Sequence, residues 1–461
     1  MSRGAASARA IERDEPSAPL ALAYASRLLA ERRRPGRTLL FAVPAPVAPV
    51  ERLLDAAGHE PTVLFAPPDA AHVAGFGVAH AVRLEGTERF DALRRESAAI
   101  FERLDVVRTD FPWPGGPRLF GGLAFAVGSS GGEFRGFGDG LFVLPRVTYV
   151  VEGTSAVLAL AVPAERSDAA VLDDVARAFA ALEDARTPAR RPVSCLSIDR
   201  GDVGAFERSV LAIVDAIRSG AFSKIVAARR AELHLTGRIE PAWLLERLGE
   251  RFPGCTRFAL DTGESVFLGA TPERLVTKKG SAVATEALAG SVALGHAKEL
   301  LASTKDLEEH RLVVDSILDA LRPFARDLSA AERPVIRELP NVLHMQTPIE
   351  GRLAEGVDVL ELVEALHPTP AVGGVPTQEA VRFIVAHEPA PRGLYAGPFG
   401  WLDASGDGAF VVALRSALFA GDRAYVYAGA GIVRDSAPGA ELAETELKMQ
   451  AILGALDGEA R

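Results

Sequence analysis

The stretch Gly408–Lys448 constrains the fold of this 461-residue chain most strongly, because its pattern predicts strand, tight turn, strand and helix in succession. Apolar residues alternate along Phe410–Leu418, which is the period-two pattern of a strand. The turn Ala420–Asp422 and a second alternating run, Tyr425–Ile432, complete a hairpin. A helix is expected from about Gly439 onwards. The chain must therefore place an antiparallel pair of strands beside a helix.

Small residues on this hairpin leave room for a ligand. Gly429 and Gly431 share one face of the second strand, and glycines inside a strand often mark the close approach of a ligand or another backbone. Arg415 lies among small residues on the first strand, where its planar guanidinium has space to bind a planar anion. We therefore expect an anion to bind beside the hairpin.

Two pairs of carboxylates have helical spacing. Glu441 and Glu444 lie on the last predicted helix, and Asp306 and Glu309 lie on a helix predicted over 305–321. Each pair alone is more typical of a solvated acidic helix face. Two such pairs on separate helices that can face each other favour a site for Mg²⁺, which prefers carboxylate oxygen.

Three single residues are candidates for acid–base chemistry. Lys224 begins a predicted strand, and a lysine whose pKa is lowered by burial can act as a general base. Glu273 follows a strand and a Thr-Pro turn, where apolar walls would keep a carboxyl protonated and able to donate. His344 lies within a strand pattern and could bind a carboxylate. The alternatives are an exposed strand-end lysine, an ordinary loop carboxylate and a satisfied core histidine, and the local patterns alone favour them.

Composition limits the class of protein. Apolar residues make up 48% of the chain, which is enough for a sizeable core. The net charge of -10, without a basic cluster, argues against nucleic-acid binding. Two cysteines are too few for a disulfide framework or a zinc site. No apolar run approaches the ~18 residues of a membrane span. We therefore expect a cytoplasmic protein with a small-molecule ligand.

The order of patterns predicts an α+β fold with largely antiparallel sheets, because strands are bunched with helices between them. Residues 1–20 lack an apolar signal core and are expected to form a disordered tail. Residues 21–182 form an N-terminal half, the polar segment 183–192 is the best linker candidate, and 193–461 form a C-terminal half.

Two further patterns bear on how the chain is organised. Apolar spacing over 206–217 predicts an amphipathic helix with Asp202 as a possible N-cap. The loop 367–376 contains three prolines and two glycines, and a pocket-lining role and a purely structural turn are about equally favoured for it.

Eight ordered segments resemble the chorismate-utilising enzymes, the family of isochorismate, anthranilate, aminodeoxychorismate and salicylate synthases. They are SKIVAAR, FLGATPERL, TEALAGS, KDLEEHRLVVDSI, LPNVLHMQTPIEG, LHPTPAVGGVP, RGLYAGPFGWLDASGDGAFVVALRS and YAGAGIVRDSAPGAELAETELK. They cover residues 205–455, approximately, and so many motifs in order argue strongly against chance. The resemblance implies an anthranilate synthase component I-like sandwich of two large, mainly antiparallel sheets with outer helices.

The resemblance also implies roles for the residues already singled out. Lys224 would be the base that activates water, and Glu273 would protonate the departing 4-hydroxyl of chorismate. Glu309 and Glu444 would hold Mg²⁺, with Asp306 and Glu441 acting through metal-bound water. The implied contacts with the substrate lie at Gly290, Ser291, His344, Ala371, Tyr395, Arg415, Gly429 and Gly431.

Those substrate contacts divide by the part of chorismate that they would meet. Arg415 and Tyr395 would bind the enolpyruvyl carboxylate, helped by backbone N–H groups around Gly429 and Gly431. Other residues would border the ring and its carboxylate, namely Gly290, Ser291 and His344. The family usually has threonine where Ser291 stands, and serine keeps the hydroxyl.

Three positions distinguish between members of the family. Water-using members carry lysine at the position of Lys224, whereas ammonia-using anthranilate synthases carry glutamine. Aminodeoxychorismate synthases have a nucleophilic lysine in the loop that here reads PTPAVGG. Salicylate synthases tend to carry threonine where Ala371 stands. The resemblance therefore implies an isochorismate synthase, an isomerase.

The pathway and the partners follow less directly from the resemblance. The N-terminal half and the chain length lean toward the menaquinone-type enzymes over those of siderophore or salicylate biosynthesis. The alternatives are a salicylate synthase that releases pyruvate and a non-catalytic chorismate-binding homologue. We expect a monomer or weak homodimer that binds chorismate and neither nucleic acid nor membrane.

Overall fold

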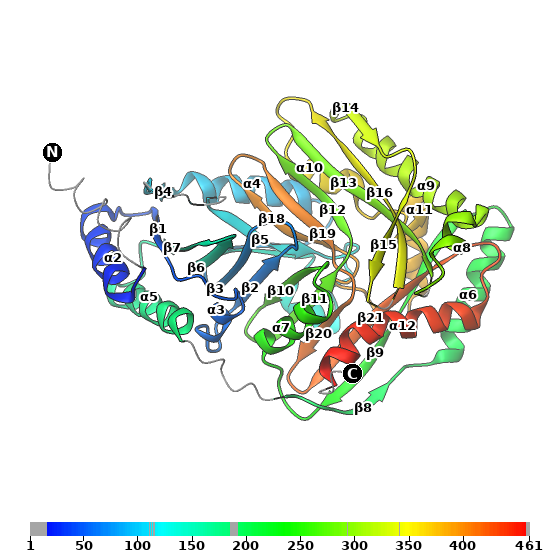
Figure 1. The fold of residues 1–461 in the computed structure, drawn as a ribbon, viewed down its shortest axis with the longest axis horizontal. Coiled ribbons are helices and arrows are strands. Elements are labelled where there is room, and N and C mark those ends of the chain that lie inside the picture. Colours follow the sequence, from blue (N-terminus) through cyan, green and yellow to red (C-terminus); the bar gives the residue numbers. More distant parts are fainter. Residues whose placement is uncertain are drawn as a thin grey trace.

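Antiparallel strands form the centre of the molecule, and helices lie outside them (Figure 1). The computed structural model describes residues 16–109, 111, 113, 116–184, 192–292, 294–340 and 342–457, without the side chains of Lys305 and Glu309. Most of the expected tail 1–20 and of the expected linker 183–192 lies outside these residues. The tail prediction is wrong at its end, because helix α2 (Ala18–Arg32) begins there and buries Ala21, Ala25, Leu28 and Leu29.

The long strand β6 (Gly140–Glu152) joins two sheets, because its two ends have different neighbours. Its first residues pair with β5 (Arg118–Leu123) and its last residues pair with β7 (Ser155–Val162). Its other edge pairs with β3 (His72–Leu84) along nearly the whole strand. Each end of β6 therefore leads into a separate sheet.

The first sheet combines strands from both halves of the chain. From β6 it continues on one side through β7, β1 (Thr38–Pro44) and β4 (Leu104–Val106). On the other side the order is β3, β2 (Thr62–Ala66), β10 (Thr256–Asp261), β11 (Ser265–Thr271), β20 (Ser416–Ala420), β21 (Arg423–Ile432) and β9 (Lys224–Leu235). Opposite ends of β9 pair with β8 (Cys195–Asp199) and β17 (Gly374–Val375).

The second sheet starts at β5. Its order is β5, β18 (Pro398–Asp403), β19 (Gly408–Val412), β12 (Arg274–Lys279), β13 (Ala282–Val292) and β16 (Val342–Leu353), with β14 (Ala325–Ala330) and β15 (Val335–Leu339) both on β16. Among the described residues only β1 and β4 pair in parallel. The prediction of two large, mainly antiparallel sheets is confirmed.

Aromatic side chains fill the space between the two sheets. The rings of Phe258 on β10 and Phe399 on β18 have centroids 4.9 Å apart, and those of Phe142 on β6 and Phe410 on β19 are 6.2 Å apart. All four side chains are buried. Because each buried phenylalanine contributes roughly 2–3 kcal/mol of apolar stabilisation, this layer holds the sheets face to face.

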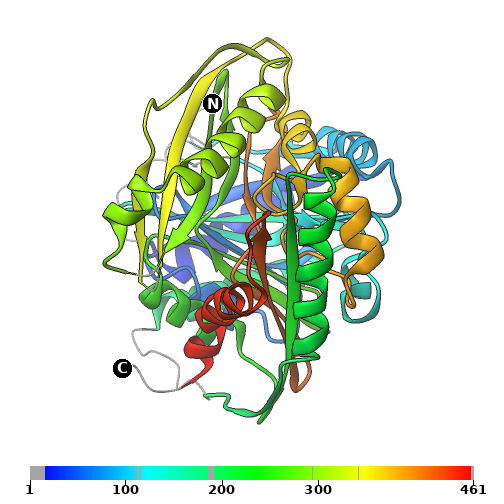
Figure 2. The same cartoon turned by 90° about the vertical axis from the view of Figure 1, so that its right-hand side faces the viewer.

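Helices cover the outer faces. Against the first sheet lie α2, α3 (Arg52–Asp55), α5 (Asp168–Glu183), α7 (Pro241–Arg251) and α12 (Pro438–Leu456). The second sheet is covered by α8 (Ala297–Ala302), α9 (Thr304–Leu321) and α10 (Val359–Leu366). Helix α4 (Arg89–Glu102) packs on β3 and α10, and α11 (Thr377–His387) packs on β9 and β17. The 3-10 helix η1 spans Gly132–Phe137. Figure 2 shows α6 (Val203–Arg218), α9, α11 and α12 together on one side of the molecule.

Helix α6 confirms the amphipathic helix predicted over 206–217. Its buried residues are Phe206, Val210, Ile213, Val214 and Ile217, and the Asp202 carboxylate accepts a hydrogen bond from the Ala205 backbone N–H at 2.8 Å. None of the described helices is both long enough and apolar enough to cross a membrane.

The prediction of a single strand over Phe410–Leu418 is wrong. Strand β19 ends at Val412 in the second sheet, and β20 begins at Ser416 in the first. Between them the backbone of Arg415 adopts a φ of +49°, a left-handed conformation that is uncommon outside glycine. The alternation of apolar residues continues across the break because both strands are buried, so the pattern does not reveal where the chain changes sheets.

Candidate active site

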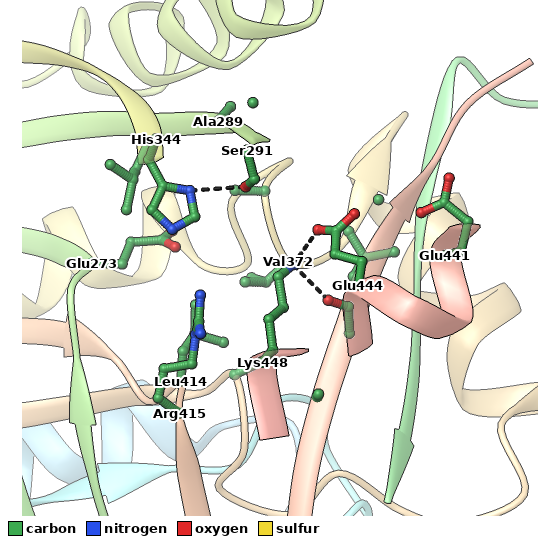
Figure 3. Close-up of a pocket in the computed structure, with 18 of the residues that line it drawn as sticks. Glu273, Ala289, Ser291, His344, Val372, Leu414, Arg415, Glu441, Glu444 and Lys448 are labelled. Carbon is green, nitrogen blue, oxygen red and sulfur yellow. Dashed lines mark hydrogen bonds and ion pairs between the residues drawn. The ribbon is translucent and has the colours of Figure 1, made fainter. Parts of the chain in front are cut away.

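One cavity of about 190 Å³ brings together every predicted site residue whose side chain the structure describes. Its walls come from β9, β13, β16, β21, α9, α12 and the loops that lead into β12, β17, β18 and β20. The predicted residues that line it are Lys224, Glu273, Gly290, Ser291, Asp306, His344, Ala371, Tyr395, Arg415, Gly429, Gly431, Glu441 and Glu444. Figure 3 labels six of them, namely Glu273, Ser291, His344, Arg415, Glu441 and Glu444. Glu309 lies on α9, but its side chain is outside those described.

Glu273 reaches the cavity where the chain passes from β11 to β12. Beside it, the segment Ala413–Arg415 passes between the same two sheets in the opposite direction. Hydrogen bonds join the two crossings: the Val412 N–H donates to the Glu273 carbonyl at 3.0 Å, and the Thr271 hydroxyl donates to the Val412 carbonyl at 2.7 Å. This pairing fixes Glu273 and Arg415 relative to each other.

The Glu273 carboxyl has the properties of a proton donor near neutral pH. It is 6% exposed, and burial together with the charge of Glu286 raises its pKa to about 7. Lys224 and Lys448 oppose this shift, as does the nearby hydroxyl of Thr369. The prediction that surroundings poor in water keep this carboxyl protonated therefore agrees with the pKa.

Lys224 is buried at the start of β9, with 5% of its surface exposed, so the alternative of an exposed strand-end lysine is wrong. Its backbone pairs with Val375 in β17, next to the proline- and glycine-rich loop. A Cβ atom added at Gly374 would lie 2.4 Å from the Lys224 carbonyl, so only glycine allows this approach. The loop 367–376 also places Ala371 in the cavity wall. Of the two alternatives for this loop, the pocket-lining role is therefore the correct one.

His344 is paired on one side of its ring only. Nδ1 lies 2.8 Å from the Ser291 hydroxyl, whereas Nε2 is buried without a hydrogen-bond partner among the described residues. Burial, with the charges of Arg415 and Lys448, lowers the pKa of His344 to about 3, so the ring is neutral. Figure 3 shows the ring beside Glu273. A buried imidazole that faces a cavity with one nitrogen unpaired can hydrogen-bond to a polar ligand. The alternative interpretation, a core histidine with both nitrogens satisfied, is therefore wrong.

Arg415 and Tyr395 give the cavity a positively charged and hydrogen-bonding wall. The Arg415 guanidinium is buried; although burial lowers its pKa, an arginine keeps its charge in proteins. Burial raises the pKa of Tyr395 to about 12, so its hydroxyl is available as a donor. The Tyr395 ring stacks on Tyr427 at 5.2 Å, and its hydroxyl would lie 3.2 Å from a Cβ added at Gly429. A buried cation of this kind calls for an anionic ligand.

Three of the four predicted metal ligands, all except Glu309, line the same cavity from two helices. They are Asp306 on α9, with Glu441 and Glu444 on α12. Glu444 Oε1 lies 2.6 Å from Lys448 Nζ, which also donates to the Gly429 carbonyl at 2.8 Å. Burial would raise the pKa of Glu444, but Lys448 and more distant cations lower it overall, so the carboxylate is ionised.

These carboxylates fit a hard cation by their chemistry, because ionised oxygen ligands are those that Mg²⁺ prefers. Among the described side chains, however, no three aspartates, glutamates, histidines or cysteines are close enough to form a ready metal cluster. The metal site therefore stays a prediction.

Comparison with known proteins places this chain in a family. Residues 30–457 match the profile of the chorismate-binding enzymes. This chain belongs to that family. It is 40% identical to the salicylate biosynthesis isochorismate synthase of Pseudomonas aeruginosa, across 86% of this chain and 85% of the relative. It is 34% identical to the isochorismate synthase MenF of Bacillus subtilis, across 75% and 76% of the two chains.

Solved structures agree with the fold of this chorismate-binding enzyme. MenF, the menaquinone-specific isochorismate synthase from Escherichia coli, matches with a TM-score of 0.81 at 26% identity, over 96% of this chain and all of that one. Anthranilate synthase component I from Streptococcus pneumoniae matches with a TM-score of 0.69 at 22% identity, which shows the fold alone. The predicted anthranilate synthase component I-like fold is confirmed.

Sequence reasoning missed several residues that line the candidate site. Lys448 continues the helical stripe of Glu441 and Glu444, and Tyr427 shares a strand face with Gly429, so both had a usable signal. Arg392 gave none: it is buried, pairs with Glu388 at 2.6 Å and donates to main-chain carbonyls of β9 and of the loop 367–376. It therefore braces the cavity wall.

Glu273→Gln should change how stability depends on pH. The folded-state pKa of about 7 lies above the ordinary value of 4.5, so the folded protein binds this proton more tightly than the unfolded chain. As pH rises between these values, Glu273 should lower the wild-type free energy of unfolding by at most roughly 3 kcal/mol. Glutamine does not titrate, so the variant should lack this loss. Urea unfolding of both proteins at pH 5 and pH 8, without ligand, measures the difference. Equal pH dependence would contradict the raised pKa.

Proposed function

We propose that this chorismate-binding enzyme is an isochorismate synthase, which converts chorismate to isochorismate by adding water at C2 and releasing the 4-hydroxyl. The observation that carries the proposal is that Lys224 and Glu273, a candidate base and a candidate acid, line one cavity beside a buried guanidinium. The names of the relatives from P. aeruginosa and B. subtilis support the same reaction.

The reaction needs one proton removed and one proton supplied. In the proposed mechanism Lys224 takes a proton from the water that attacks C2. Glu273, with a pKa of about 7, gives its proton to the departing 4-hydroxyl. Because the step uses one acid and one base, it also runs in reverse when the two groups exchange roles.

The two carboxylates of the substrate would be held apart from this chemistry. Arg415 and the Tyr395 hydroxyl would bind the enolpyruvyl carboxylate, with backbone N–H groups near Gly429 and Gly431. The unpaired Nε2 of His344 would contact the ring carboxylate, with Gly290 and Ser291 bordering the ring. Binding at both ends would fix the ring between Lys224 and Glu273, which lowers the entropic part of the barrier.

Mg²⁺ is part of the proposal. Glu309 and Glu444 would hold it, with Asp306 and Glu441 acting through bound water. When bound, the ion would neutralise and hold the ring carboxylate. Lys448, which pairs with Glu444, lowers the pKa of that carboxyl and so keeps it ionised.

A salicylate synthase is the second candidate, because it would begin with the same reaction and then release pyruvate. Ala371 speaks against it, since an alanine methyl offers no hydroxyl to the cavity. A non-catalytic homologue is disfavoured because base, acid and anion-binding residues are all present. For the pathway, the relative named for salicylate biosynthesis has the higher identity and coverage of the two reported, which favours salicylate over the menaquinone route first expected from the sequence.

The product distinguishes the two enzymes. Incubation of the pure protein with chorismate and Mg²⁺ near neutral pH should give isochorismate, and incubation with isochorismate should give chorismate. Chromatography separates these acids from salicylate, and a lactate dehydrogenase coupled assay reports pyruvate. Release of stoichiometric pyruvate without an added lyase would contradict the assignment as an isochorismate synthase and support a salicylate synthase instead.

Lys224→Ala should lower kcat by roughly 10²–10⁴-fold, because a general base is lost, and should leave chorismate binding nearly unchanged, because other residues hold its carboxylates. Single-turnover rates and equilibrium binding measure the two effects. Lys279→Ala is the control, since this lysine is exposed at the end of β12. Turnover within tenfold of wild type in Lys224→Ala would refute the assignment of the base.

Glu444→Gln should weaken Mg²⁺ binding, because it removes a charge and a hard oxygen ligand. Calorimetric titration should show a higher Kd, and excess Mg²⁺ should restore part of the activity. The matched control is Glu446→Gln on the same helix, whose carboxylate pairs with Arg200 and Arg229 outside the cavity lining. The same Mg²⁺ affinity in Glu444→Gln and wild type would count against a metal site on α12.

A further inference from the structure

A second buried carboxyl, that of Glu286, lies close enough to Glu273 to raise its pKa. Glu286, on β13, is only 9% exposed and does not line the cavity. Its Oε1 accepts hydrogen bonds from the backbone N–H of Arg274 at 3.2 Å and from Arg337 Nη1 at 3.1 Å. Its Oε2 accepts from the amide of Gln346. Glu286 thus ties together β12, β13, β15 and β16 immediately next to the candidate acid.

We propose that Glu286 is a positioning residue for Glu273, which anchors the turn that carries this acid and uses its buried charge to keep the acid in its proton-donating form. The inference rests on the proposed function, in which Glu273 is the proton donor. The anchoring is direct, because the N–H that Glu286 accepts belongs to Arg274, the residue after Glu273.

The charges around Glu273 show why such a residue is needed. Lys224 on β9 and Lys448 on α12 both favour ionised Glu273, and Arg415 lies in the same cavity. Tyr395 and His344 are neutral, because their pKa values are about 12 and about 3. After burial itself, Glu286 is the strongest influence that raises the pKa of Glu273. Without its charge, the lysines would draw the carboxyl toward the ionised form.

Arg337 gives a way to adjust this charge from outside the cavity. It forms the ion pair with Glu286 from β15 and donates a second hydrogen bond to the Gly254 carbonyl at 2.8 Å. Because Arg337 partly neutralises Glu286, removal of Arg337 should strengthen the field of Glu286 on Glu273. The two substitutions, Glu286→Gln and Arg337→Gln, should therefore act in opposite directions.

The test is the pH dependence of kcat, with saturating chorismate and Mg²⁺. A general acid must be protonated, so activity falls as pH rises through its pKa. Glu286→Gln should move this fall to lower pH by roughly one unit, with about a tenfold lower kcat at pH 8 and little change in KM. Arg337→Gln should move it to higher pH. Arg326→Gln, at an exposed arginine on neighbouring β14, is the control and should not move it.

Opposite shifts support the inference, because a merely structural role would lower kcat without moving the profile in two directions. An unmoved profile in both variants, or shifts of the same sign, would overturn it. If circular dichroism shows that Glu286→Gln does not fold, the test rests on Arg337→Gln alone. In that case, no shift of the fall in kcat to higher pH would overturn the inference.

A second readout separates this inference from the proposed function. The pH dependence of urea unfolding reports the Glu273 proton without turnover, when each variant is compared with and without Glu273→Gln. A protein that makes no isochorismate but shows the opposite shifts in unfolding would refute the proposed function alone. Production of isochorismate without those shifts would refute the role of Glu286 alone.

Discussion

The paired crossing of two chain segments between the sheets is the constraint on which the cavity depends. Residues 272–273 leave the first sheet for the second, and 413–415 return beside them, joined by the hydrogen bonds of Thr271 and Val412. Buried backbone groups must be paired, so the two crossings stabilise each other where no sheet can continue. Their position delivers Glu273 and Arg415 to one place, and the packing of Phe258 on Phe399 prevents the sheets from moving apart.

The electrostatic surroundings differ from one side of the cavity to the other, and so do the pKa shifts of its carboxyl groups. Ionised Glu444 and its partner Lys448 lie on the side of α12, whereas the Glu273 carboxyl is buried with a pKa of about 7. The same low dielectric surroundings that raise one carboxyl pKa strengthen the ion pair that lowers the other. Two glutamates in one cavity thus have pKa values shifted in opposite directions, because their neighbours differ.

Much of this arrangement could be predicted from the sequence. The features that were missed have identifiable physical reasons for having escaped prediction. Helix α6 and the two carboxylate pairs follow from helical spacing, and Lys224 and Glu273 were found at the ends of strand patterns. Glu286 was missed because its position within an alternating strand resembles any other, and only the pairing of β13 with β16 brings Gln346 to it. The crossing at Arg415 was missed because burial on both sides preserves the alternation.

The geometry of the candidate site arises where regular strands are interrupted, and this explains the glycines around it. At Gly290 the pairing of β13 with β16 shifts register, with a φ of +78°. This left-handed backbone conformation is strained for any residue with a Cβ, so the bulge favours glycine. Beyond the shift, Ser291 stands opposite His344 and holds its Nδ1, which leaves Nε2 for a ligand. A regular ladder would have placed a different residue opposite the histidine. The irregularity therefore serves the site, and a search for periodicity finds the strands but not the functional contact between them.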